Sequence, residues 1–208
     1  MEIHTPDHPI TGWKETAKHL AIVTVGVLIA LALEGIVAWA DHRLLVREAK
    51  SNLTAEIQAN RKELESTFKS MEQETDDLQH ADEIAVLLLK HTPQAKMELN
   101  LSTNSAELKN AAVTTGQITG AFGYMDYGTV RRYADVYDFQ AQYLRLQERD
   151  GQNLAAILGF VPRIASGMPQ PDAAIEQWRD RIGAAAASIY LREQLARQLV
   201  KRYDELLH

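Results

Sequence analysis

One apolar stretch near the start of the chain limits what this protein can be. Residues 20–40 read LAIVTVGVLIALALEGIVAWA, 21 residues in which only Thr24 and Glu34 are polar. A helix rises about 1.5 Å per residue, so this stretch reaches roughly 30 Å, the thickness of the hydrocarbon core of a bilayer. It therefore predicts a transmembrane helix that anchors the rest of the chain in a lipid bilayer.

The flanks of the stretch fit a membrane span but leave its direction open. Trp13 and Trp39 would lie roughly 39 Å apart along a continuous helix, close to the separation of the two headgroup layers that tryptophan favours. The positive-inside rule does not orient the chain, because basic residues stand on both sides of the span. They are Lys14 and Lys18 before it and Arg43, Arg47 and Lys50 after it.

Three residues within the span predict an oligomeric seam. Gly26, Ala30 and Glu34 follow one another at intervals of four and share one face of the helix. Small residues let transmembrane helices approach closely, and an ionisable group in lipid costs a few kcal/mol unless it faces a partner or water. We interpret the face as a seam in which Glu34 is protonated or hydrogen-bonded. The alternative is that Glu34 lies near enough to the interface to be wetted without a partner.

A cleaved signal peptide is the rival interpretation of the same stretch. Ala38-Trp39-Ala40 before Asp41 has the form of a signal-peptidase site, and residues 21–33 would supply the apolar region. Apolar character continues through residues 35–37, however, and helix-forming sequence runs on after Asp41. We therefore favour an uncleaved anchor.

Length and composition limit the number of domains, the partners and the kinds of metal site that the chain can have. The chain has 208 residues, which divide into a tail over 1–19, the span over 20–40 and one domain over 41–208. The net charge of −6 comes with no basic stripe, so we expect no nucleic-acid partner. The chain contains no cysteine, which excludes disulfides and thiolate metal sites.

The periodicity of residues 41–208 predicts an all-α domain, most simply an antiparallel bundle of about four helices. The transmembrane helix continues into a stalk helix, whose apolar stripe is interrupted by Asn60, Thr67 and Glu74. We expect the stalk to reach residue 91, with a break allowed within 68–82, and a loop to follow over 92–103. A second helix is expected over 105–122. A third starts at 125, ends or bends near 151 and reaches 164, and a last helix begins at Pro171.

Two stretches resemble bacterial membrane proteins without an assigned activity. Gly26 to Glu34 (GVLIALALE) and the L-x-x-E-I-x-x-N pattern of Leu53 to Asn60 resemble uncharacterised bacterial single-pass proteins. Residues 112–140, with Thr115-Gly116, a Y-M-D-Y motif and an R-Y-A-x-x-Y motif, resemble hypothetical proteobacterial membrane proteins. The resemblance implies an anchor in the bacterial inner membrane and a periplasmic helical domain. It implies no activity.

A cluster of aromatic residues is the candidate ligand site. We predict a pocket between helices, lined by Tyr124, Tyr127, Arg132, Tyr133 and Tyr137, in which rings pack against a ligand and hydroxyls orient it. The alternative is that these are core aromatics whose hydroxyls reach the rim.

No residue pattern in the chain predicts catalysis or a bound metal. A di-metal bundle needs Glu-x-x-His on two helices, but around His80 and Glu83 the chain offers only Asp77-x-x-His80, once, so we interpret this cluster as a solvated acidic face. Nucleophile and phosphate-loop motifs are missing, and we expect neither an enzyme nor a cofactor.

Three functions stay open at this stage. The first is a membrane-anchored structural or interaction protein that self-associates or docks on a larger membrane complex. The second is a sensor whose bundle holds a small molecule near Tyr133 and Tyr137. The third is an oligomer that passes ions or protons along Glu34.

Overall fold

The computed structural model describes residues 12–92, 99–101 and 104–208, and within these ranges the chain is helical and has no strand. This confirms the all-α class, with a long N-terminal helix followed by further helices. The chain separates into two compact units, Met1–Glu48 and Ala49–His208. Residues 1–11 of the predicted tail and most of the predicted loop over 92–103 lie outside the described residues.

In the first unit, the described chain forms the beginning of α1 (Trp13–Ser66). The large apolar side chains from Leu20 to Trp39 are each 52–70% exposed, so no described residue covers them. In the described part of the chain this is the one helical stretch long and apolar enough to cross a membrane. The hydroxyl of Thr24 donates to the carbonyl of Leu20 at 2.8 Å, which satisfies it within the helix. The unit is compatible with a single-pass anchor.

The second unit begins with the last turns of α1, which break at Thr67 and continue as α2 (Phe68–Leu89). The break falls one residue before the predicted window of 68–82. The buried hydroxyl of Thr67 donates to the carbonyl of Leu64 at 2.7 Å, and the Thr67 amide bonds the same carbonyl at 3.2 Å. Threonine tightens the helix locally because its side chain competes for a carbonyl of the preceding turn.

The predicted helix over 105–122 is wrong in its extent. Residues 104–110 are not helical, α3 covers only Ala111–Ile118, and a short 3₁₀ turn, η1 (Ala121–Tyr124), follows. Gly120 between them has a φ of 72°, a conformation that glycine adopts without the strain of a side chain. The segment before α3 stays extended because side chains of other helices, rather than its own carbonyls, bind its amides.

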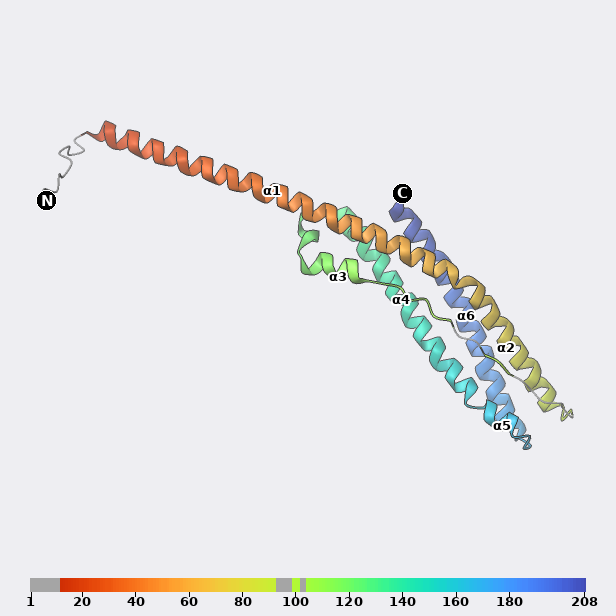
Figure 1. Cartoon of the computed structure of the whole chain (residues 1–208). Helices are drawn as coiled ribbons and strands as arrows, with labels where there is room; N and C mark the ends of the chain where they lie inside the picture. Colours follow the sequence, from red (N-terminus) through yellow and green to blue (C-terminus); the bar gives the residue numbers. More distant parts are fainter. Residues whose placement is uncertain (1–11, 93–98, 102–103) are drawn as a thin grey trace, which may run out of the picture. The chain divides into compact units, whose positions relative to one another are not determined.

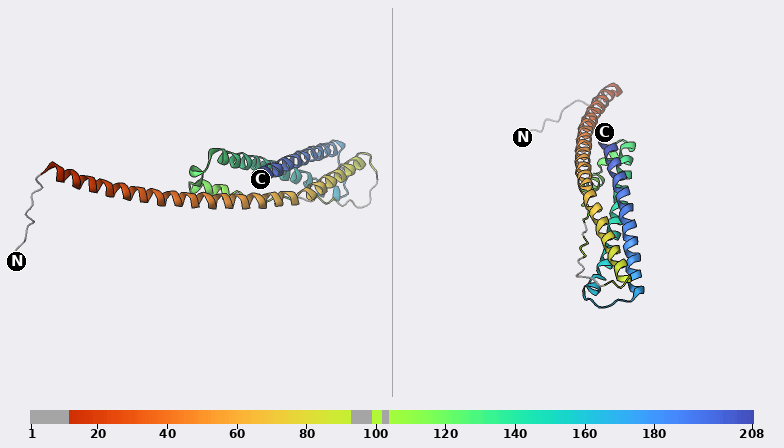
Figure 2. Two further views of the ribbon diagram at one scale, coloured as in Figure 1. Left: turned by 90° about the horizontal axis from the view of Figure 1, so that it is seen from above. Right: turned by 90° about the vertical axis from the view of Figure 1, so that its right-hand side faces the viewer.

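The other helices run the length of the second unit. A side-chain cap from Asp126 to the Thr129 amide, 2.9 Å long, starts α4 (Tyr127–Leu158), which passes through Gly151 without the expected interruption. A short α5 (Val161–Ala165) leads into α6 (Asp172–Leu207). Helix α6 packs antiparallel along both α2 and α4, as Figures 1 and 2 show.

The core of the second unit follows a heptad spacing. The buried residues of α6 recur at alternating intervals of three and four, as in coiled coils: Ile175, Trp178, Ile182, Ala185, Ile189, Arg192, Ala196, Leu199 and Tyr203. The same alternation runs through the stalk from Leu53 to Ala85 and passes the break at Thr67 without a shift. The polar interruptions of the stalk therefore occupy core positions.

We predict that Leu199→Ala lowers the free energy of unfolding by about 2–5 kcal/mol, because it leaves a cavity at a fully buried position. Leu191→Ala on the same helix is the matched control, since Leu191 is 52% exposed and its loss should cost little. Urea unfolding of the full chain in mild detergent micelles, followed by circular dichroism, measures both. Equal effects of the two substitutions would contradict the heptad core.

Candidate functional site

The predicted seam lies on an uncovered face of α1. Gly26, Ala30 and Glu34 are exposed, and a Cβ built on Gly26 or Gly35 would meet no atom within 4 Å. Glycine costs a helix about 1 kcal/mol relative to alanine, so these glycines weaken α1 without relieving any crowding within the described chain. The packing of another helix against this face stays a prediction.

The residues of the predicted aromatic pocket lie in different settings. Tyr133 and Tyr137 are buried, and the hydroxyl of Tyr137 donates to Glu56 at 2.6 Å. Tyr124 and Tyr127 are 54% and 80% exposed. Arg132 lines a surface pocket of about 140 Å³ together with side chains of α6 rather than with the tyrosines. A pocket lined by all five residues stays a prediction.

The acidic cluster around His80 lies on the surface. The side chains of His80 and Glu83 are 58% and 61% exposed, and Nδ1 of His80 lies 3.7 Å from the Glu83 carboxylate. Among the residues that the structure describes, no group of three or more histidine or carboxylate side chains is placed to hold a metal ion.

The structure reveals a neutral polar layer in the core. The Asn60 amide donates to Gln140 at 3.2 Å, and the buried hydroxyl of Tyr203 donates to the same Gln140 oxygen at 2.6 Å. The three side chains come from α1, α4 and α6, and each is at most 2% exposed. Polar residues that bond one another at heptad core positions set the register of the packed helices.

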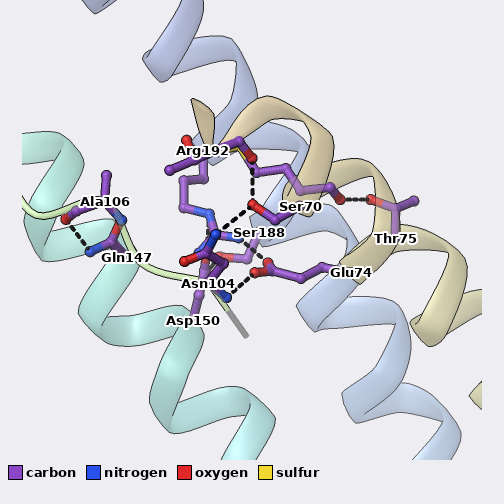
Figure 3. A network of polar contacts seen from close by, with 11 residues as sticks. Ser70, Glu74, Thr75, Asn104, Ala106, Gln147, Asp150, Ser188 and Arg192 are labelled. Atoms are coloured by element: carbon purple, nitrogen blue, oxygen red, sulfur yellow. Dashed lines mark hydrogen bonds and ion pairs between the residues drawn. The ribbon is translucent and has the colours of Figure 1, made fainter. Parts of the chain in front are cut away.

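A charged layer lies about two heptads further along the bundle, and Figure 3 shows it. Arg192 of α6 binds Glu74 of α2 through Nη2, and its Nε lies 3.2 Å from Oδ2 of Asp150 of α4. All three side chains are at most 6% exposed. Ser188 donates a hydrogen bond to the other oxygen of Asp150. One guanidinium thus holds two carboxylates from two different helices.

Burial shifts the pKa of two groups in and beside this layer, Asp150 and Tyr143. Desolvation raises the pKa of Asp150 above its ordinary value of 3.8, although the hydroxyl of Ser188 and the charge of Arg192 oppose the shift. Desolvation also raises the pKa of the neighbouring Tyr143 hydroxyl to about 12. The approach of Arg192 Nε to Asp150 Oδ2 is an ion pair without hydrogen-bond geometry. A cavity of about 30 Å³ beside them has room for a water that could bond both.

Side chains of the long helices hold an extended segment beside these layers. The amide of Asn104 bonds Glu74 at 2.9 Å, and Gln147 bonds both the amide and the carbonyl of Ala106, at 2.9 and 3.1 Å. Farther along the segment, Asn60 accepts from the Lys109 amide at 2.8 Å and donates to the Lys109 carbonyl at 2.7 Å. Glu56 then binds the amide of Ala112 at 2.9 Å. These bonds replace those of the helix predicted for this segment.

The spacing of the polar residues in the stalk indicates these layers, although from the sequence these residues are predicted only to interrupt the apolar stripe. Asn60, Thr67 and Glu74 are separated by seven residues each, so they share one heptad position. Their partners, Gln140 and Asp150 in α4 and Arg192 in α6, also lie at core spacing. The charged groups of the network pair with one another across three helices, so its geometry points to specifying the fold rather than to a reaction.

Comparison with protein families, curated proteins and solved structures finds no match to this chain. Its function is therefore inferred from the geometry of its own residues.

We predict that Arg192→Met lowers the free energy of unfolding by about 3–5 kcal/mol, because it leaves two buried carboxylates without a counter-charge. Arg131→Met is the matched control, since the side chain of Arg131 is 70% exposed in a surface pair with Asp135, worth at most about 0.5 kcal/mol. Urea unfolding of the full chain compares them. Similar losses for both would contradict the role of the charged layer.

The raised pKa of Asp150 predicts a pH dependence of stability. The folded state binds the proton of Asp150 more tightly than the unfolded state, so this residue's contribution to stability falls as pH rises from about 3.8 through the raised pKa. Asp150→Asn does not titrate. The unfolding free energy of the wild type minus that of Asp150→Asn should therefore decrease over this interval. A difference that is flat or rises with pH would show that Arg192 and Ser188 hold Asp150 as the ion throughout.

Proposed function

We propose that this chain is a single-pass membrane protein that self-associates through the Gly26–Ala30–Glu34 face of α1, with its helical second unit as a rigid interaction module. On the resemblance of the anchor to bacterial proteins, we further propose that the membrane is a bacterial inner membrane and that the second unit is periplasmic. In this role the chain docks with copies of itself or with a larger membrane complex.

The observation that carries the proposal is the uncovered apolar helix with a carboxylate on its small-residue face. Lipid can cover the apolar side chains but does not stabilise the ionisable Glu34, which needs a polar neighbour or water. Gly26 and Ala30 lie on the same face, where small side chains let two backbones approach. A second copy of α1 would supply both the close packing and a hydrogen-bond partner for Glu34.

The second unit supports the proposal through its rigidity. Its core helices are held in register by two buried polar layers, and its extended segment is tied to α1, α2 and α4 by side-chain bonds to the backbone. A unit of this kind has a fixed outer surface, which lowers the entropy lost when a partner docks.

We predict that Ala30→Leu weakens self-association by about tenfold or more, because the larger side chain separates the helices at the seam. Ala32→Leu makes the same change about 200° around the helix and should leave the oligomer intact. Sedimentation of the full chain in detergent micelles over a range of protein-to-detergent ratios measures the association. A wild-type chain that stays monomeric at every ratio, or equal losses for the two variants, would contradict the seam.

The carboxylate can be tested separately at Glu34. Glu34→Gln keeps a hydrogen-bonding side chain and should retain the oligomer, whereas Glu34→Leu should weaken it in the same sedimentation assay. Retention by both variants would mean that the Glu34 side chain is wetted at the interface rather than bonded in a seam.

The absence of native cysteine makes the orientation directly testable. We predict that Lys201→Cys, on an exposed position of α6, reacts with a membrane-impermeant maleimide in cells with a permeabilised outer membrane. Lys14→Cys, before the span, should react only after the inner membrane is lysed. The reverse pattern would place the second unit in the cytoplasm.

A further inference from the structure

A groove at one end of the second unit is lined by two arginines and by no acidic residue. It lies where α4 ends, α5 turns and α6 begins (Figure 1), and its volume is about 280 Å³. We call it the tip groove and define it by Gly159, Phe160, Arg163, Ala174, Gln177 and Arg181. Its size is just below the range usual for small-molecule pockets, which suits a ligand smaller than a drug.

Both charged residues that line the tip groove are arginines. Neither Arg163 nor Arg181 forms an ion pair with any residue that the structure describes, although the chain as a whole carries a net charge of −6. Glu176 and Asp180, which flank Gln177 and Arg181 on α6, do not line the groove, and two further acidic side chains pair elsewhere. Asp172 lies 3.8 Å from Nε2 of His91, and Asp82 binds Arg179 at 2.7 Å. Two like charges in one groove repel each other unless an anion joins them.

The rest of the lining is preformed. The ring of Phe160 stacks on Trp178 with 5.3 Å between centroids and an interplanar angle of 25°, and the Trp178 indole donates to the Ile157 carbonyl at 3.1 Å. The guanidinium of Arg163 lies 5.9 Å from the centre of the Phe160 ring, which orients it. Gly159 and Ala174, which also line the groove, have little or no side chain and so leave its volume free for a ligand.

We propose that the tip groove binds a small ligand through an oxyanion, a phosphate or a carboxylate, that Arg163 and Arg181 hold between them. Guanidinium groups present a planar set of donors that matches both anions. Gln177 can donate a further hydrogen bond, and the apolar body of the ligand would lie against Phe160 and Ala174. This site is separate from the seam in α1, so it stands or falls independently of self-association.

The test is calorimetric titration of the full chain in uncharged detergent micelles at low salt. Three probes identify the source of the oxyanion: glycerol 3-phosphate for a soluble phosphate, glycerophosphoglycerol for a lipid headgroup, and succinate for a carboxylate. We expect at least one to bind saturably. Arg163→Gln and Arg181→Gln should each weaken that binding about tenfold or more, because each removes a charged donor.

Arg145→Gln is the matched control, since it removes one exposed arginine of α4 outside the groove and should leave the affinity unchanged. The fold of each variant is checked by thermal unfolding, and each variant should unfold at the same midpoint temperature as the wild type. Saturable binding by none of the probes, or an equal loss in Arg145→Gln, would overturn the proposal. The arginines would then serve only to neutralise the carbonyl end of α4.

Discussion

The second unit depends on one buried guanidinium. Arg192 occupies a heptad core position of α6, where it binds Glu74 of α2 and lies against Asp150 of α4. The three groups are removed from water, so the two carboxylates tolerate burial only while the guanidinium lies between them. This requirement allows one register of the three helices. An apolar residue at the same position could pack in several, because apolar contact has no direction.

The neutral layer around Asn60 repeats this arrangement about two heptads away and extends it to the backbone. Asn60 and Gln140 bond both each other and the carbonyl of Lys109. The Lys109 carbonyl of the extended segment accepts hydrogen bonds from the buried side chains of Asn60 and Gln140, and the Lys109 amide donates one to Asn60. The Lys109 backbone and the buried amide side chains of Asn60 and Gln140 therefore depend on one another, which couples the segment to the packed helices.

The first unit presents the opposite situation. No described residue covers its large apolar side chains. A side chain added at Gly26 or Gly35 would meet no described atom. Under the proposed function, lipid covers the apolar side chains of this unit and a second copy bonds Glu34. The two units thus differ: packed helices cover the core of the second unit, whereas no described residue covers the apolar helix of the first.

The amino-acid sequence alone determined the helical class and the position of the apolar span, because both follow from local periodicity and length. It also placed the polar interruptions of the stalk at Asn60, Thr67 and Glu74. Only the tertiary structure decided that these interruptions are core positions, since their partners lie in helices remote in sequence. It also decided that residues 104–110 are not helical, because side chains from distant helices bind the backbone amides of this segment and override its local helix propensity. The same holds for the tip groove, whose arginines come together only when α5 turns the chain back along α4.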